Sequence, residues 1–438
     1  MGIKVTKFGG TSMADAKSMN QVANIIKSDA QRRYVVVSAP GKRFKEDIKI
    51  TDLLYSCYYD IEIKGECTDS FNKIRERFIK IVEDLKLDYD IVPELDKVER
   101  EMKQYHSPAF CASRGEYLSA VIMSHLLGFK FVDAKELMIF SEEGDFLAEE
   151  TNENIKNKFK NLKCVVVPGF YGADPLGNIH TFSRGGSDVS GAVIARAVKA
   201  TIYENWTDVN GFMVTDPRIV DKPEKIDVLS YQELRELSYM GANVLHPDSI
   251  FPVRVSGIPI NIRNTFEPTN SGTMIVPVVD DVEAKKRVVT GIAGKKGYST
   301  VFIEKSMMNG ELGFARKVLS CFEYYNMSIE HMPSGIDTMS IIVADSELAG
   351  KEDVLLEKIR QTVNPDHIEI KTGIALIATV GHGMCFNPGT SAKLCLALAN
   401  ANINIRMLDQ GSSELNIIVG VTDKDYESAI KAIYHAFY

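Results

Sequence analysis

No run of apolar residues in this sequence approaches the roughly 18 residues that a membrane-crossing helix requires, and no signal peptide opens the chain. None of the seven cysteines belongs to a C-x-x-C pair, so neither a zinc site nor a disulfide framework is expected. Scattered thiols in odd number suit a reducing compartment. The sequence therefore predicts a cytoplasmic protein with no membrane partner.

Positive charge is in short supply, with 51 lysines and arginines against 59 aspartates and glutamates and a net charge of −8. Because a phosphate backbone is bound by clustered lysine and arginine, no nucleic-acid partner is expected. A small anionic substrate is not excluded, since a pocket can be locally basic within an acidic protein. The length of 438 residues exceeds one ordinary hydrophobic core, so we expect two or three domains.

Short β-branched runs alternate with longer helical patterns from residue 3 to about residue 265. The runs are apolar throughout, which is typical of strands buried on both faces of a mostly parallel sheet. They lie at 35–38, 131–133, 164–167 and 201–203. Helical patterns such as 115–127 and 190–199 separate them, so this half is expected to be an α/β fold, a mostly parallel-sheet αβα sandwich.

Composition changes at 266–288, which is turn-rich and then strongly charged. We place a domain boundary there, giving a first domain at 1–284 and a second region at 285–438. Within the second region, a shift of 76 residues aligns 313–343 with 389–419 without a gap. Each copy reads as strand, glycine turn, amphipathic helix, asparagine turn and two strands, which predicts two small α+β modules packed on each other.

The first motif with chemistry is K-F-G-G-T-S at 7–12, between an expected strand and an expected helix. Gly9 and Gly10 would let the backbone approach a phosphate, and the helix N-terminus adds its positive dipole end. Lys7 can reach a phosphoryl group in transfer. The alternative is an ordinary glycine turn with a solvated lysine. The segment is not the Walker A pattern, so a P-loop NTPase is not expected.

The second motif is S-R-G-G-S-D at 183–188, again just before an expected helix. Arg184 can clamp a carboxylate with two parallel hydrogen bonds. Ser187 could cap the helix, which leaves Asp188 free to pair with Lys7. The alternative is a glycine turn with capping residues and no ligand.

Two further motifs are less specific. In W-T-D…T-D-P-R at 206–218 a strand ends in polar residues, where open α/β sheets bind ligands; the alternative is a turn-rich loop. In S-R-G-E at 113–116, Glu116 is expected in the first turn of a helix, where a carboxylate suits the helix dipole. A carboxylate that faces the pocket could instead bind an α-ammonium group.

Together these motifs resemble those of aspartate kinase, in the amino acid kinase superfamily, over essentially the whole chain. The segments that carry the resemblance are K-F-G-G-T-S at 7–12, V-V-V-S-A at 35–39, I-T-D-L-L at 50–54, S-R-G-E at 113–116, R-G-G-S-D at 184–188 and W-T-D…T-D-P-R at 206–218. The repeat resembles tandem, ferredoxin-like ACT modules, the first at about 299–372 and the second at about 373–438 with a strand from 285–298.

The resemblance implies ATP-dependent phosphorylation of the L-aspartate side chain to 4-phospho-L-aspartate, the first step of lysine, threonine and methionine biosynthesis. It implies that Lys7 stabilises the phosphoryl group in transfer and that Asp188 positions Lys7. Mg²⁺ is expected to be held mainly by the ATP phosphates and water, not by a cage of protein ligands. The residues implied for ATP and its phosphates are Lys7, Gly9, Gly10, Thr207, Asp208, Met213 at the adenine, Asp216, Arg218 and Asn243. Those implied for aspartate are Ser38, Thr51, Glu116, Arg184 and Ser187.

The sequence departs from the family pattern at two places. Some members carry lysine where this chain has Asn243, and asparagine cannot supply that charge to ATP. Residues 41–49 also lengthen the segment before Thr51, so the geometry of Thr51 is less secure.

By the same resemblance, six residues match an inhibitor site of lysine-sensitive relatives, which predicts lysine as inhibitor, alone or with threonine. They are Met308, Gly313, Phe314, Ser328, Ile329 and Glu330. The alternative is that Phe314 and Ile329 are core residues and that Glu330 is solvated. The modules are also expected to pair across a homo-oligomer, a dimer or a tetramer.

Two rival functions stay open. Another amino acid kinase, for glutamate or acetylglutamate, would share the fold, although the motif at 206–218 and the tandem modules favour aspartate. A non-catalytic amino-acid sensor with a degenerate kinase domain is the second rival, and the presence of Lys7, Arg184 and Asp188 argues against it. No dinucleotide fingerprint follows the repeat, so a fused homoserine dehydrogenase is not expected.

Overall fold

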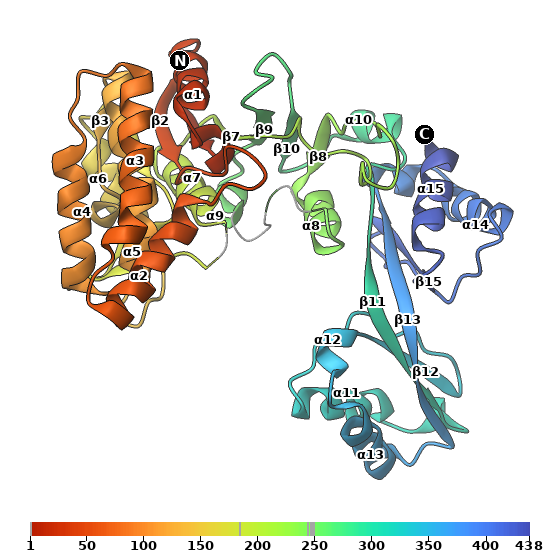
Figure 1. Ribbon diagram of the computed structural model, residues 1–438. Coiled ribbons are helices and arrows are strands. Elements are labelled where there is room, and N and C mark those ends of the chain that lie inside the picture. Colours follow the sequence, from red (N-terminus) through yellow and green to blue (C-terminus); the bar gives the residue numbers. More distant parts are fainter. Residues whose placement is uncertain (1, 184, 243–244, 246–249) are drawn as a thin grey trace. The chain divides into compact units, whose positions relative to one another are not determined.

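The computed structural model describes residues 2–183, 185–242, 245 and 250–438, and the chain forms two compact units (Figure 1). Unit 1 comprises Met1–Phe212, Lys225–Tyr231 and Val244–Val278. Unit 2 comprises Met213–Glu224, Gln232–Asn243 and Val279–Tyr438. Within the described residues, no helix is both long and apolar enough to span a membrane.

Unit 1 is built on an eight-stranded sheet in the order β3-β4-β2-β1-β7-β9-β10-β8. All neighbouring strands are parallel except β9 and β10, so the predicted mostly parallel sheet is confirmed. The strands are β1 Lys4–Phe8, β2 Arg32–Val37, β3 Lys130–Phe131, β4 Val165–Pro168, β7 Ile202–Thr207, β8 Val228–Ser230, β9 Ile260–Asn264 and β10 Thr273–Val276. The carboxyl ends of β1, β2 and β7 therefore meet at one edge of the sheet.

Helices cover this sheet on both faces, because every residue of β4 is buried and α5 and α7 both pack against the central strands. Figure 1 shows α2, α3, α4 and α5 side by side. The remaining elements of unit 1 are η1 Gly10–Met13, α1 Ala16–Lys27, α2 Ile50–Lys64, α3 Thr68–Leu85, α4 Val92–Tyr105, α5 Pro108–Leu127, η2 Ala134–Glu136, the hairpin β5 Tyr171–Ala173 with β6 Ile179–Thr181, α6 Ala148–Phe159, α7 Gly186–Ala197 and α9 Phe251–Val255.

Helix α5 begins earlier than the sequence pattern predicted. Ser107 caps it by accepting a hydrogen bond from the Phe110 amide, and Pro108 occupies the first helical position. The helix ends at Gly128, which adopts a left-handed conformation with φ of 68°. The prediction that Glu116 lies in a first turn is therefore wrong: it lies in the middle of the helix, where the terminal dipole has little effect.

Unit 2 contains a five-stranded antiparallel sheet in the order β12-β11-β13-β15-β14. Its strands are β11 Gly291–Glu304, β12 Thr338–Ala344, β13 His367–Val380, β14 Met407–Asp409 and β15 Asn416–Thr422. Its helices are α8 Tyr231–Tyr239, which lies in unit 2 from Gln232 on, α10 Asp281–Lys286, η4 Met308–Gly310, α11 Phe314–Tyr324, α12 Asp345–Leu348, α13 Glu352–Val363, η5 His382–Phe386, α14 Thr390–Asn400 and α15 Tyr426–Phe437.

The two copies of the repeat share β11 and β13, which run through both (Figure 1). The later half of β11 pairs with β12, and the later half of β13 pairs with β15. On α11 the predicted apolar face is buried at Phe314, Val318 and Phe322. Burying a side chain of this size contributes about 1.5–3 kcal/mol, so this face fixes the helix on the sheet.

Candidate active site

Lys7 and Asp188 meet at the carboxyl edge of the unit 1 sheet. Lys7 is the fourth residue of β1, and Asp188 lies in the first turn of α7. The Lys7 Nζ lies 2.6 Å from Asp188 Oδ1, with 10% and 16% of the side chains exposed. The predicted proximity of these two motifs, 181 residues apart in the chain, is therefore present. Breaking a buried pair costs about 3–5 kcal/mol, so each partner holds the other in place.

Asn205 completes this pair, and the sequence analysis missed it. It lies beside Lys7 in the β1–β7 register, and its Nδ2 donates to Asp188 Oδ1 over 2.8 Å. The carboxylate of Asp188 is thus held by two donors, which leaves the Lys7 ammonium fixed at the sheet edge. A polar amide inside an otherwise buried strand was the available signal, because such a residue needs a partner.

Gly9 and Gly10 form a tight backbone loop directly after β1. The Gly9 amide donates to the carbonyl of Trp206 over 3.0 Å, and a Cβ on Gly9 would lie 3.6 Å from Lys7 Nζ. A Cβ on Gly10 would lie 3.1 Å from the Ala39 carbonyl oxygen, and one on Gly41 would overlap Gly10 at 2.7 Å. The absence of side chains therefore lets two loops approach each other under the Lys7 ammonium, as a phosphate-binding surface requires.

Thr207 ends β7 and Asp208 follows it, at the same edge of the sheet. Asp208 is exposed and accepts a hydrogen bond from the Thr11 hydroxyl over 3.0 Å and from the Thr207 hydroxyl over 3.2 Å. This places both residues beside the glycine loop, within reach of a ligand there. Their predicted contact with a nucleotide stays a prediction.

Glu116 is a buried carboxyl group with an incomplete set of partners. It is 6% exposed, and its Oε2 has no hydrogen-bond partner among the described residues. Burial raises its pKa to about 8, and the Ala39 amide and the charge of Arg114 offset only part of that effect. A carboxylate without a cation is costly at this depth, so the group is suited to a ligand ammonium.

The other residues predicted to bind aspartate surround the same sheet edge. The Ser38 amide donates to the Phe8 carbonyl over 3.1 Å, directly after β2. Ser187 is 8% exposed and packs on Gly169, where a Cβ would lie 2.7 Å from it. Thr51 is the second residue of α2 and is half-buried.

A buried arginine fixes the long segment before Thr51, and the sequence analysis did not find it. Arg77 of α3 is 6% exposed and donates to the carbonyls of Ala14, Ile48 and Gly41. It also lies 3.4 Å from Asp47, whose pKa Arg43 and Arg77 hold far below its usual range. The segment 41–49 is thus tied to the glycine loop. Arg77 occupies an apolar-face position of an amphipathic helix, which was the only signal.

Three of the residues predicted to bind ATP, Met213, Asp216 and Arg218, belong to unit 2. Arg218 pairs with Asp216 at 2.6 Å and lowers the pKa of that carboxyl, with 88% of the arginine side chain exposed. Arg184 and Asn243 lie outside the described residues. Among the described residues, no group of three His, Cys, Asp or Glu side chains could hold a metal ion.

The residues predicted to bind an effector have mixed surroundings in unit 2. Met308 and Phe314 belong to the core of the first module, and Ile329 packs against it. Gly313 caps α11 with φ of 76°, and Ser328 is exposed. Glu330 is not simply solvated, since its Oε2 accepts a hydrogen bond from the Tyr239 hydroxyl over 2.7 Å.

Comparison with known proteins identifies relatives along the whole chain. The amino acid kinase family model matches residues 2–264, and an ACT domain model matches residues 377–437. Aspartokinase 3 of Bacillus subtilis (strain 168) is 34% identical over 452 residues, which cover 100% of this chain and 99% of that protein. The chain spans 50% of the length of the bifunctional aspartokinase/homoserine dehydrogenase of Daucus carota.

Solved structures agree with this similarity. The aspartate kinase of Clostridium acetobutylicum is 48% identical, with a TM-score of 0.90 over 100% of both chains. Aspartokinase III of E. coli in complex with aspartate and ADP is 25% identical, with a TM-score of 0.75 over 99% of both chains. The same E. coli enzyme in complex with lysine and aspartate is 26% identical, with a TM-score of 0.74 over 100% of this chain and 99% of that one.

Proposed function

This chain belongs to the aspartokinases of the amino acid kinase family, and we propose that its Lys7 site transfers the γ-phosphoryl group of ATP to the side-chain carboxylate of L-aspartate. The observation that carries the proposal is the Lys7–Asp188 pair at the sheet edge, over a glycine loop and in the same unit as Glu116, whose Oε2 has no hydrogen-bond partner among the described residues. The E. coli relative was solved with aspartate and ADP, which are the substrate and product of that reaction.

The reaction needs no general base. A side-chain carboxyl of aspartate has a pKa near 3.9, so the nucleophilic oxygen is ionised at neutral pH. That oxygen bonds to the γ-phosphorus as the bond to the β-phosphate oxygen breaks, which yields an acyl phosphate and ADP. The difficulty is that an anion must approach a polyanion, so positioning and charge neutralisation by Lys7 and backbone amides carry most of the rate.

Mg²⁺ is proposed as the companion of ATP. At the sheet edge Asp208 is an exposed carboxylate beside the glycine loop, and Asp188 is already held by Lys7 and Asn205. One available carboxylate fits a cation bound mainly through phosphate oxygens and water. When bound, Mg²⁺ would neutralise charge on the transferring phosphates.

A coupled assay of ADP release tests the activity and its substrate. We expect turnover with L-aspartate and little with L-glutamate or N-acetyl-L-glutamate. Preference for either of the last two would replace the substrate assignment with that of another amino acid kinase. No turnover with any acidic amino acid would leave a ligand-binding sensor as the function.

Lysine is proposed as a feedback inhibitor that binds at Glu330. The E. coli relative was solved with lysine and aspartate, which supports an effector of this class. In this chain Tyr239 at the end of α8 already donates to Glu330, so a ligand ammonium must compete with that hydroxyl. Inhibition requires that lysine binds one conformation more tightly than another. Assays with lysine and with threonine, alone and together, decide which effector acts.

Tyr239→Phe should make the enzyme more sensitive to lysine. The change removes the hydroxyl that competes for Glu330 but keeps the ring, so the lysine concentration for half-inhibition should fall about tenfold or more, because a hydrogen bond to a charged group contributes about 1.5–3 kcal/mol. Tyr324→Phe is the matched control, because it removes a hydroxyl from an exposed tyrosine of the first module, which also contains Glu330. It should leave the lysine concentration for half-inhibition unchanged. Unchanged or weaker inhibition in Tyr239→Phe would remove Glu330 from the lysine site.

We also propose a homo-oligomer that pairs through the first module. Three large apolar side chains of this module are strongly exposed: Met307 at 79%, Leu312 at 95% and Ile336 at 69%. Met307 and Leu312 are the chain neighbours of Met308 and Gly313, two of the proposed effector residues. The Ile336 carbonyl accepts a hydrogen bond from the Asn309 amide of η4. Large apolar side chains exposed together suit burial against a second copy. Analytical ultracentrifugation should show a dimer or tetramer; a monomer at micromolar concentration contradicts this.

The seven free cysteines support a reducing, cytoplasmic location for this first step of lysine, threonine and methionine synthesis.

A further inference from the structure

We propose that a cavity in unit 1, between the α4–α5 helices and the β5–β6 hairpin, binds a small zwitterion such as a free amino acid, with Arg114 holding its carboxylate. The cavity has a volume of about 460 Å³. None of its lining residues belongs to the groups assigned above to aspartate, ATP or the effector. The site therefore goes beyond the proposed function and does not depend on it.

Arg114 is the reason to expect a carboxylate. It is 3% exposed, and its guanidinium lies over the rings of Phe110, Tyr117 and Tyr171 at 4.4, 4.9 and 5.1 Å. Within the described part of the chain its hydrogen bonds go only to the Ser113 hydroxyl, from Nε and Nη2, and no carboxylate forms an ion pair with it. The charge of Arg114 contributes to the lowered pKa of Glu94 and offsets part of the rise that burial causes in the pKa of Glu116, but neither carboxylate forms an ion pair with it. A buried cation without an ion-pair partner is costly, and its free N–H groups can bind a carboxylate.

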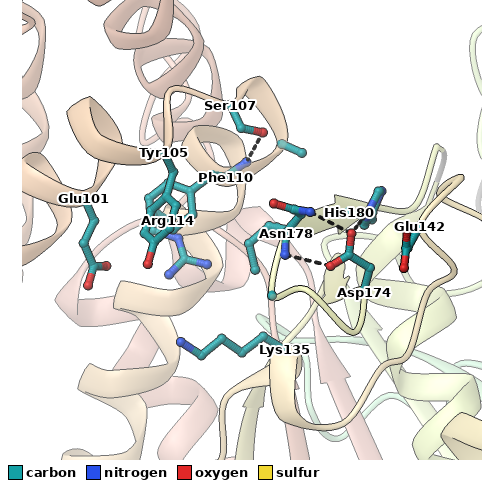
Figure 2. A pocket seen from close by; sticks show the side chains of 13 residues that line it. Glu101, Tyr105, Ser107, Phe110, Arg114, Lys135, Glu142, Asp174, Asn178 and His180 are labelled. Atoms are coloured by element: carbon teal, nitrogen blue, oxygen red, sulfur yellow. Dashed lines mark hydrogen bonds and ion pairs between the residues drawn. The ribbon is translucent and has the colours of Figure 1, made fainter.

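The opposite wall is held rigid by a satisfied carboxylate. Asp174 accepts hydrogen bonds from the backbone amides of Leu176 and Asn178, from the Asn178 side chain and from His180. These donors outweigh burial and hold its pKa at about 2. In Figure 2, Asp174 with Asn178 and His180 faces the side on which Arg114 and Lys135 lie. Asp174 thus shapes the hairpin and is not available to bind a ligand ammonium.

The other charged side chains that line the cavity are of both signs, which favours a zwitterion over a polyanion as the ligand. Lys135 adds a second positive charge near Arg114, and Glu101 and Glu142 add negative charges (Figure 2). Neither glutamate forms an ion pair within the described residues. Three carboxylates around the cavity repel a polyphosphate, whereas a zwitterion can place its carboxylate at Arg114 and its ammonium at a glutamate.

The cavity is separate from the catalytic edge. Arg114 and Glu116 lie two residues apart on α5, so their side chains do not face each other. Glu116 is absent from the cavity lining, as are Lys7, Ser38 and Ser187. Binding at the two places can therefore be separated by mutation.

The imidazole of His180 lines the cavity and can report its occupancy by nuclear magnetic resonance. The chain has eight histidines, and loss of one signal in His180→Gln assigns the resonance. At pH 8, titration with glycine should move the His180 signal saturably, acetate should move it more weakly, and inorganic phosphate should not. Arg114→Lys should weaken glycine binding about tenfold or more, since the planar pair of donors is lost. Glu116→Gln should leave the titration unchanged.

Lys135→Ala and Glu101→Gln keep the test valid if Arg114→Lys does not fold, because both side chains lie outside the core. Each should weaken glycine binding several-fold. Any of three results would overturn the proposal. The first is a glycine titration in which all three variants behave like the unchanged protein. The others are a His180 signal that no probe moves and a stronger response to phosphate than to glycine. Aspartate kinase activity is measured separately, so failure here leaves the proposed function standing.

Discussion

Lys7→Ala should lower kcat by about 10²–10³, the size expected for the loss of one charge-stabilising donor. The ammonium lies at the sheet edge over the glycine loop. Apart from the chain neighbours of Gly9, Lys7 Nζ is the only described side-chain atom within 4 Å of the position that a Gly9 Cβ would take. Because the group acts on charge that develops in the transition state, KM for ATP should change less than kcat. Steady-state ADP release with saturating aspartate and ATP measures both constants.

Two controls separate this effect from damage to the fold. Lys17→Ala removes an exposed lysine from α1 and should leave kcat unchanged. Lys7→Ala leaves Asp188 with Asn205 as partner, so its stability loss should be measured by urea unfolding. Near-normal turnover in folded Lys7→Ala would remove Lys7 from the mechanism.

Glu116→Gln should raise KM for aspartate about 10²-fold while changing kcat little. The carboxylate is buried and has an oxygen without a partner, so it is suited to the α-ammonium of aspartate, at the end of the substrate that does not react. Glutamine keeps the shape and loses the charge, and a hydrogen bond between charged groups contributes about 1.5–3 kcal/mol. KM for ATP is the internal control. An unchanged KM for aspartate would place the ammonium elsewhere.

Because the pKa of Glu116 is raised, stability and KM for aspartate should depend on pH in the unchanged protein and not in Glu116→Gln. In the unfolded chain this carboxyl titrates near 4.5, and in the folded chain near 8. Between these values the folded chain holds a proton that the unfolded chain has lost, so stability falls as pH rises through the window. Aspartate needs the ionised form, so its KM should fall from pH 6.5 to 8.5. Both slopes should be absent in Glu116→Gln.

The sequence predicted the sheet of unit 1 because its strands are apolar on both faces and separated by helical patterns. It predicted α5 poorly, since the run from Pro108 to Leu127 is buried nearly all round and has no amphipathic period to mark its start. Glu116 was therefore placed in a first turn that lies eight residues upstream.

Chain segments 213–224 and 232–243 also join unit 2, which a single boundary at 284 cannot represent.

The candidate site was predictable where a motif carries its own chemistry. Lys7 and Asp188 are a cation and an anion at the ends of two glycine motifs, and their pairing follows from charge. Asn205 and Arg77 were missed because each depends on tertiary contacts: one on strand register, the other on three carbonyls from distant segments. The partner of Glu330 was missed for the same reason, since Tyr239 lies 91 residues away in the chain.

The sharing of β11 and β13 restricts how the repeat can change over evolutionary time. Inserting or deleting one residue near the start of either strand would turn every later side chain to the opposite face, in both copies at once. The pairing of β11 with β13 is irregular between Lys295 and Thr300, around Gly297 with φ of 89°. A bulge of this kind absorbs an extra residue. Insertions and deletions among descendants of this gene should therefore occur at this irregularity and in surface loops. The number of residues in the rest of both strands should stay constant.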